Sequence, residues 1–223
     1  DVVLTVTDDA GNSSSCTAVV TVVDDIAPAI TCVGDQSRPA ITGTNAYTVL
    51  GNEFDATFSD NCGSATITND YNHSASLATA SLTIGVHTIT WTVNDGHGQS
   101  TSCTTTITIT DEDAPVVTCV AHTVSNDVDA CSYTVQGIEL DATASDNGGI
   151  DKLENSINHT NTLQGETFPV GNTSVTWTAT DNAGLTSSCV SVITVEDIQH
   201  PVAICQSLTI NLDASGAATI TAE

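Results

Sequence analysis

Hydrophobic and polar residues alternate along several short stretches of the chain, and the clearest of these is 86–93. In this stretch His87, Ile89, Trp91 and Val93 occupy alternate positions, and mostly polar residues lie between them. Successive side chains of a β-strand point to opposite faces of a sheet. We therefore expect a strand that buries one face and exposes the other.

The rest of the sequence favours short strands as well. Val, Ile and Thr dominate, Met is absent, and no segment has the pattern of an amphipathic helix. Turns rich in Gly, Asn and Asp separate the β-prone stretches. Between residues 26 and 112, strands are expected at 29–33, 46–50, 65–68, 81–84, 86–93 and 102–110. The predicted fold class is all-β.

The chain repeats itself with a period of 86 or 87 residues. Cys103 follows Cys16 by 87 positions, and Cys189 follows Cys103 by 86. A unit of this length is too long for a solenoid repeat and suits a small, self-contained sandwich domain. We expect tandem β-sandwich domains, arranged like beads on a string.

The repeat sets the predicted domain boundaries. Residues 1–25 match the end of one repeat, 26–112 and 113–198 form two complete repeats, and 199–223 match the start of another. The chain is then a stretch of a longer polymer. Alternatively, a subunit with these ends could complete itself with a neighbour by strand exchange.

Two tryptophans occupy equivalent positions in the complete repeats. Trp91 and Trp177 are 86 residues apart, and Leu4 takes the same position in the first repeat. An indole buries on the order of 200 Å², which suits the centre of a small sandwich. We interpret both tryptophans as core residues, not as a repeated platform for sugar binding.

The charge of the chain is strongly unbalanced. Asp and Glu number 27 against two basic residues, Arg38 and Lys152, so the net charge is −25. Such acidity excludes binding to nucleic acid and to anionic membranes. The 39% of hydrophobic residues argues against disorder. No stretch approaches the roughly 18 apolar residues of a membrane span, so no membrane insertion is expected in this segment.

The cysteines indicate the cellular compartment of the protein, and the sequence lacks common catalytic motifs. Eight cysteines without a close CxxC pair indicate disulfides, and hence an oxidising, extracellular compartment. No His-Glu-x-x-His, Gly-x-Ser-x-Gly or phosphate-loop pattern occurs. Paired carboxylates are present, but their repetition suits a structural ion better than one acid/base site. The chain is therefore not expected to be an enzyme.

Several motifs resemble a known module. They include Ala114 to Cys119, Thr167 to Gly171, Val175 to Gly184, Ser188-Cys189 and Val192 to Val195. Together they are similar to the hyalin repeat (HYR), an immunoglobulin-like extracellular module of cell-adhesion proteins. The stretch from Pro201 to Ile220 resembles the HYR modules of Bacteroidetes surface adhesins in particular. The resemblance implies a cell-surface location and names no ligand.

The implied fold suggests how four of the cysteines pair. In an immunoglobulin-like sandwich strands A and G run parallel and start at the same pole. Residues 1–25 then correspond to strands F and G, and 199–223 to strands A and B. This topology pairs Cys32 with Cys103 and Cys119 with Cys189, each closing a loop of about 70 residues worth roughly 4 kcal/mol. The alternative pairing is a bond between Cys16 and Cys32. In the preferred scheme, the partners of Cys16 and Cys205 are cysteines outside residues 1–223.

Two further cysteines are not equivalent to each other. Cys62 falls in the B to C loop of its repeat, and Cys131 falls in the A to B turn of the next. The A to B turn of one domain faces the B to C loop of the following domain in this topology. We hypothesise that such pairs link neighbouring repeats, and that the junction where Gly148 replaces cysteine lacks the link.

Acidic residues recur at matching places in each repeat. Calcium takes six to eight oxygen ligands, and extracellular modules bind it with affinities on the order of 0.1 to 1 mM. The linkers, B to C loops and F to G turns should meet at one pole, so we expect a junction Ca²⁺ site; the alternative is that these residues only form turns. The candidate ligands are Asp24, Asp25, Glu53, Asp55, Asp60, Asn61, Asp95, Asp111, Glu112, Asp113, Glu139, Asp141, Asp146, Asn147, Asp181, Asn182 and Asp197.

These features favour a structural function. The chain is predicted to be the repeat region of an extracellular filament or adhesin stalk, linked by disulfides and stiffened by calcium. Its partners would be neighbouring repeats or copies of the same protein. The alternative is multivalent binding of a polysaccharide or a surface protein. The loops 69–80 and 154–165 differ in sequence, which argues against a ligand pocket shared by the repeats.

Overall fold

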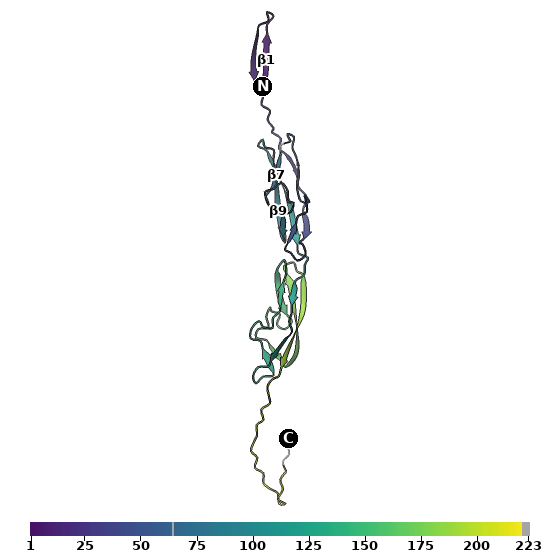
Figure 1. Cartoon of the computed structure of the whole chain (residues 1–223), viewed down its shortest axis with the longest axis vertical. Coiled ribbons are helices and arrows are strands. Elements are labelled where there is room, and N and C mark those ends of the chain that lie inside the picture. Colours follow the sequence, from purple (N-terminus) through teal and green to yellow (C-terminus); the bar gives the residue numbers. More distant parts are fainter. Residues whose placement is uncertain (64, 220–223) are drawn as a thin grey trace. The chain divides into compact units, whose positions relative to one another are not determined.

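A computed structural model describes residues 1–63 and 65–219 of the chain (Figure 1). The described residues form eighteen β-strands and no helix. None of them therefore belongs to a helix long and apolar enough to cross a membrane. The all-β fold class is confirmed.

The chain divides into two compact units. Unit 1 contains residues 1–118, 143–154 and 177–189, and unit 2 contains 119–142, 155–176 and 190–223. Unit 1 begins with an antiparallel hairpin of β1 (Val2–Thr7) and β2 (Ser13–Ala18). Every residue of the two hairpin strands is exposed.

The first sandwich lies entirely in unit 1. Its four-stranded sheet has the order β4 (Gln36–Pro39), β10 (Ser100–Thr110), β9 (Gly85–Asn94) and β7 (Thr66–Asn69). Two short antiparallel pairs complete it: β3 (Ala29–Thr31) with β6 (Thr57–Ser59), and β5 (Ala46–Thr48) with β8 (Ser81–Thr83).

The second sandwich repeats this scheme strand for strand. Its four-stranded sheet has the order β12 (His122–Ser125), β18 (Thr186–Glu196), β17 (Gly171–Asp181) and β15 (Ile150–Asn155). The two short pairs are β11 (Val116–Thr118) with β14 (Thr143–Ser145), and β13 (Ser132–Thr134) with β16 (Thr167–Pro169). The 86-residue period is thus a period of structure.

The expected parallel pairing of the first and last strands is confirmed. β10 runs parallel to β4 with Ile107 opposite Gln36, and β18 runs parallel to β12 with Ile193 opposite His122. This pairing closes each repeat, because the last strand returns beside the first. It also fixes where the linker after β10 leaves the sandwich.

Alternation along β9 and β17 gives each sandwich its core. Ile89, Trp91 and Val93 are buried on β9, while the intervening residues are exposed or half-buried. On β17, Val175, Trp177 and Ala179 are buried in the same way. Both tryptophans have no exposed surface, so their assignment to the core is confirmed. At the equivalent position Leu4 is 59% exposed.

Two strands of the first sandwich were not expected from the sequence. β4 is polar and contains Pro39, which is unusual inside a sheet. It is tolerated because β4 lies at the edge of the sheet, where β10 is its one neighbour among the described strands. β6 has three exposed residues, Phe58 included, so it lacks the alternation by which buried strands are recognised.

Strands A and B expected within 199–223 are absent from 199–219, and 220–223 lie outside the described residues. The complete repeats give the physical reason. Their first strands pair with strands that come later in the same repeat: β3 with β6, β4 with β10, and β5 with β8. Without such partners, residues 199–219 cannot form these ladders.

Replacing the core tryptophan should destabilise the first sandwich strongly. We expect Trp91→Ala to lower the free energy of unfolding by about 3–5 kcal/mol, as measured by urea denaturation. Trp91→Phe should cost less, because the indole Nε1 of Trp91 is buried without a hydrogen-bond partner. Leu4→Ala, at the exposed equivalent position, is the matched control and should have little effect. Equal losses for Trp91→Ala and Leu4→Ala would contradict this assignment of the core.

Candidate metal centre

Three aspartates converge at one end of the second sandwich, within unit 1. Asp111 lies in the linker after β10, Asp146 in the loop after β14, and Asp181 at the end of β17. One carboxylate oxygen of each lies within 4.8 Å of the others. We call these three residues the second acidic cluster. The expectation that linker, B to C loop and F to G turn meet is confirmed for this cluster.

Asp181 is the most buried member of the second acidic cluster, with 1% of its surface exposed. Its Oδ1 accepts hydrogen bonds from the backbone N–H groups of Ala183 (2.9 Å) and Leu185 (2.8 Å), which shape the turn between β17 and β18. Its Oδ2 is buried without a hydrogen-bond partner among the described residues, as is Oδ2 of Asp111. Buried polar atoms without partners are rare and costly. Two carboxylate oxygens of the cluster are thus left available to a ligand.

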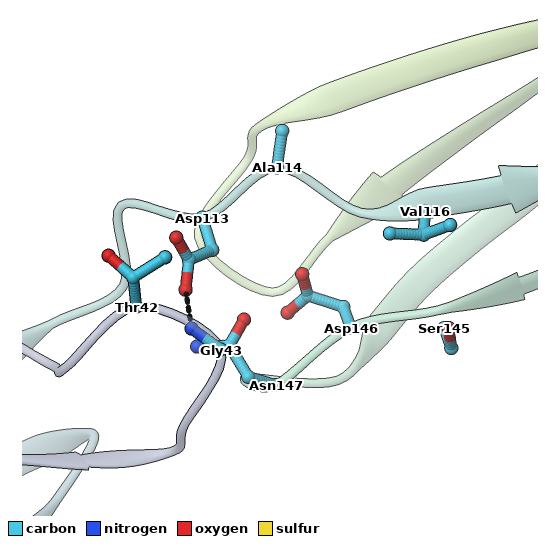
Figure 2. A pocket seen from close by; sticks show the side chains of 8 residues that line it. All are labelled: Thr42, Gly43, Asp113, Ala114, Val116, Ser145, Asp146 and Asn147. Atoms are coloured by element: carbon cyan, nitrogen blue, oxygen red, sulfur yellow. Dashed lines mark hydrogen bonds between the residues drawn. The ribbon is translucent and has the colours of Figure 1, made fainter.

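Hydrogen bonds hold the linker against the loop after β14. Asn147 donates through Nδ2 to Asp111 Oδ1 (3.3 Å) and to the backbone oxygen of Thr44 (2.7 Å). Asp113 accepts a bond of 2.7 Å from the backbone N–H of Gly43, marked by the dashed line in Figure 2. The same view shows Asp146 and Asn147 beside these groups. The linker carboxylates are therefore fixed from both sides.

A second set of residues repeats this arrangement around the preceding linker. Asp24, Asp95 and His97 offer ligand atoms within 4.8 Å of one another, and we call them the first acidic cluster. Asn61 donates to Asp24 Oδ1 (3.0 Å), as Asn147 does to Asp111. His97 was not among the residues predicted from the sequence. The sequence could have indicated His97 as a ligand by its position two residues after Asp95, in the turn that follows β9.

Hydrogen bonds keep the carboxylates of the first acidic cluster ionised. The side-chain amide of Asn61 and the thiol of Cys62 lower the pKa of Asp24. Burial alone would raise the pKa of Asp95, but the backbone N–H groups of His97, Gln99 and Gly98 outweigh it and lower that pKa. The hydrogen bond with Asp24 is in turn the main cause that raises the pKa of the Cys62 thiol.

Four candidate ligands are used by the protein itself, away from both clusters. Glu53 accepts from Tyr47, from Leu50 N–H and from Arg38. Glu139 accepts from Tyr133 and from Gln136 N–H in the second sandwich. Asp55 and Asp141 each accept a backbone bond from a buried leucine, Leu77 or Leu163. These four carboxylates order the chain between strands.

The remaining candidates lie around the clusters or apart from them. Asp60 accepts from the backbone of Cys62, and Asn182 donates to the backbone oxygen of Gly148. Asp197 accepts from Asn126 in unit 2. Asp25 and Glu112 are exposed linker residues outside both groups of three.

The two basic side chains of the chain do not neutralise the clusters. Arg38 pairs with Glu53 at 3.1 Å and lies over the ring of Phe54. Lys152 pairs with Glu154. Neither side chain therefore supplies a counter-charge to the second acidic cluster.

The donor atoms decide which cation suits each cluster. The second acidic cluster offers only carboxylate oxygens, the ligands of hard cations such as Ca²⁺ and Mg²⁺. The first contains the His97 imidazole, which suits transition metals better than calcium. The residues of the second cluster therefore fit calcium, and two of its oxygens lack another partner.

The predicted disulfides are present. Cys32 and Cys103 are bonded, with their Cα atoms 5.9 Å apart. Cys119 and Cys189 are disulfide-bonded as well. The rival bond between Cys16 and Cys32 is thus excluded. Cys16, Cys62, Cys131 and Cys205 are free and exposed.

The loops expected to differ between repeats share a backbone turn. Asn69 N–H bonds to the backbone oxygen of Ser74, and Asn155 N–H bonds to that of Thr160, both at 3.0 Å. His73 and His159, 86 residues apart, both have φ of 58°. Side-chain hydrogen bonds of Asn69 and Asn155 impose the same turn on these different sequences.

The strand order, the closing disulfides and the recurring linker contacts define tandem immunoglobulin-like β-sandwich domains. The HYR domain matches residues 23–109 and 110–195. The chain therefore belongs to the HYR domain family. Domains of this family occur in extracellular and cell-surface proteins, and this chain is extracellular.

Two curated relatives are sea-urchin proteins named hyalin. The chain is 32% identical over 203 residues to hyalin of Strongylocentrotus purpuratus and 30% identical over 214 residues to hyalin of Lytechinus variegatus. The matches cover 88% and 92% of this chain but only 16% and 38% of the relatives. Neither relative supports the expected likeness to bacterial adhesins in particular.

Cadherin-type structures are similar at a low level. The human mucin-like protocadherin EC1-2 structure has a TM-score of 0.40 and 13% identity, over 76% of this chain and 98% of that one. A likeness of this size adds nothing to the family assignment.

The contact between Asp24 and Cys62 can be tested by thiol chemistry. We expect Asp24→Asn to speed alkylation of Cys62 by iodoacetamide at pH 8, because removing the carboxylate lowers the pKa of the thiol and raises its thiolate fraction. Asp25→Asn makes the same charge change at the neighbouring exposed residue and should leave the rate unchanged. Mass spectrometry of the Cys62 peptide gives both rates. Identical rates in the two variants would refute the contact.

Proposed function

We propose that the chain is the structural repeat region of an extracellular filament or adhesin stalk, whose linkers are stiffened by calcium. It comprises the end of one repeat (1–25), two complete repeats (26–112 and 113–198) and the start of a further one (199–223). No step of catalysis is part of this function. Its partners are neighbouring repeats or copies of the same protein.

The observation that carries the proposal is the recurrence of the linker contacts. Asn61 bonds Asp24 as Asn147 bonds Asp111. In the loops that carry these asparagines, Asp60 accepts a hydrogen bond from the backbone N–H two residues later. Asp146 accepts the equivalent bond in the next repeat. The contacts between a linker and the next sandwich thus recur in each repeat, as the core tryptophan and the closing disulfide do.

Calcium is the cation that the second acidic cluster favours. Asp111, Asp146 and Asp181 supply only oxygen donors, and no basic side chain is bound to them. A divalent cation would neutralise the carboxylates and tie the linker to two loops of the following sandwich. Backbone oxygens and water would complete the six to eight ligands that calcium takes.

The first acidic cluster supports a weaker calcium site. Asp24 and Asp95 correspond to Asp111 and Asp181, but the third member is the exposed His97. Imidazole is not a usual ligand of calcium. We therefore assign the tighter calcium site to the second acidic cluster.

Calcium should raise the melting temperature of the chain. With a dissociation constant of about 0.1–1 mM, 10 mM calcium adds roughly 1.4–2.7 kcal/mol of stability. This raises the melting temperature by about 5 °C or more, as measured by circular dichroism against EDTA.

The variant Asp181→Asn tests whether this stabilisation comes from the second acidic cluster. It should abolish the calcium shift while leaving the protein without calcium at least as stable, because it removes like-charge repulsion and keeps Oδ1 as an acceptor. Asp151→Asn makes the same charge change at an exposed site of β15 and should keep the full shift. A shift that survives in Asp181→Asn would show that calcium binds elsewhere.

A glycine beside Asp111 offers a second test of the site. A Cβ at Gly148 would lie 2.1 Å from Asp111 Oδ2 and 3.4 Å from Asp146 Oδ2. Gly148→Ala must therefore displace a ligand carboxylate, and we expect calcium affinity measured by isothermal titration calorimetry to fall by tenfold or more. Gly34→Ala is the control, because nothing lies within 4 Å of its Cβ position. Equal affinities for the two variants would place calcium outside this cluster.

A further inference from the structure

Two free cysteines occupy complementary positions of the repeat. Cys131 ends the turn between β12 and β13, and its equivalent 86 residues earlier, between β4 and β5, is Asn45. The two turns have the same geometry. Ile41 N–H bonds to the Ala46 oxygen as Asp127 N–H bonds to the Ser132 oxygen. We call them the A to B turns.

The other free cysteine lies in the loop that faces such a turn. Cys62 follows β6, and its equivalent after β14 is Gly148. The backbone N–H of Cys62 bonds to Asp60 Oδ2 at 3.1 Å, and that of Gly148 bonds to Asp146 Oδ2 at 2.7 Å. We call these segments the B to C loops.

Within unit 1, an A to B turn contacts the B to C loop of the following repeat. Asn147, adjacent to Gly148, donates to the backbone oxygen of Thr44, adjacent to Asn45, at 2.7 Å. Figure 2 shows the segment of Thr42 and Gly43 beside that of Asp146 and Asn147. The two positions equivalent to the free cysteines are thus each next to a residue of this contact.

At the junction between the two complete repeats, neither of these two positions carries a cysteine. Asn45 and Gly148 are each adjacent to a residue of this contact, whereas a partner of Cys131 or of Cys62 would have to come from a following or a preceding repeat. Both cysteines are absent from the junction between the complete repeats, and one cysteine is present at the position that belongs to each neighbouring junction. This distribution is expected if the two cysteines act as a pair.

The A to B turn with Cys131 is held by its linker in the same way as the turn with Asn45. Asp113 accepts from Gly43 N–H at 2.7 Å, and Gln199, 86 residues later, accepts through Oε1 from Asp129 N–H at 3.1 Å. Gln199 also donates to the backbone oxygen of Asp127 (2.6 Å). The linker after the second sandwich therefore starts along the same course.

We propose that Cys131 forms a disulfide with a cysteine in the B to C loop of the following HYR repeat, and that Cys62 forms one with a cysteine in the A to B turn of the preceding repeat. The oxidant is a low-molecular-weight disulfide such as oxidised glutathione. One protein thiolate attacks it and releases one small thiol, leaving a mixed disulfide. The second protein thiolate displaces the other small thiol. Two protein S–H groups are lost, and the oxidant leaves as two thiols.

This inference deepens the proposed function, since it rests on the tandem order of repeats but not on calcium. It gives selected junctions a covalent link in addition to the cation. Calcium binding is measured by melting and calorimetry, whereas the disulfide is measured by mass. Failure of one is therefore distinguishable from failure of the other.

The native protein provides the first test. Proteolysis without reductant, after blocking of free thiols, should give the Cys131 peptide linked to a peptide from the B to C loop of the next repeat. The Cys62 peptide should be linked to one from an A to B turn. Blocked free thiols at both positions, or a bond between Cys131 and Cys62 of two copies, would overturn the proposal.

An engineered pair tests the geometry within this chain. Asn45→Cys and Gly148→Cys are introduced together, with the four free cysteines Cys16, Cys62, Cys131 and Cys205 replaced by Ser. Under oxidised and reduced glutathione the new pair should form an intramolecular disulfide, seen as a linked peptide. Retention of the Cys32–Cys103 and Cys119–Cys189 bonds reports that both sandwiches of the variant have folded.

The control pair is Asn45→Cys with Ser100→Cys. Ser100 pairs with Asn94 at the opposite end of the sheet from Thr110. The A to B turn with Asn45 follows Ala40, whose N–H bonds to the backbone oxygen of Thr110. This pair should stay reduced under the same buffer. A folded Asn45→Cys/Gly148→Cys protein that links no faster than the control would overturn the proposal.

Discussion

The repulsion among three buried or half-buried carboxylates governs this part of the molecule. Oxygens of Asp111, Asp146 and Asp181 lie within 4.8 Å of one another, and at an effective dielectric constant of about 20 each pair repels by at least about 3 kcal/mol. The two basic residues, Arg38 and Lys152, are paired with Glu53 and Glu154. In the proposed function a calcium ion from solution offsets this repulsion.

The β-sandwich brings these carboxylates together. Parallel pairing of β10 with β4 sets the point where the linker leaves, and the disulfide between Cys32 and Cys103 joins the first strand to the last. Cys103 pairs in register with Trp91, so the core tryptophan and the disulfide lie on adjoining strands. The acidic residues sit at the strand ends. The packing and the disulfide of the sandwich thus hold these carboxylates close together against their mutual repulsion. A linker without the sandwich could not do so.

The sequence was sufficient to predict the fold, because alternation along β9 and β17 and the cysteine spacing are periodic signals. It also indicated Asp24, Asp95, Asp111, Asp146 and Asp181, since immunoglobulin-like topology brings linker and loops to one pole. It could not separate these from Glu53, Asp55, Glu139 and Asp141. All nine are carboxylates in register, and only the structure shows that the last four lie outside the two acidic clusters. His97 and the exposed β6 have no repeating or alternating pattern and were missed.

In the proposed function, the second acidic cluster holds a calcium ion. The most direct measurement is a crystal structure of the chain grown with calcium, with anomalous diffraction recorded at long wavelength. We expect an anomalous peak about 2.3–2.6 Å from carboxylate oxygens of Asp111, Asp146 and Asp181. Calcium peaks elsewhere in the molecule, with only water between these three residues, would contradict it.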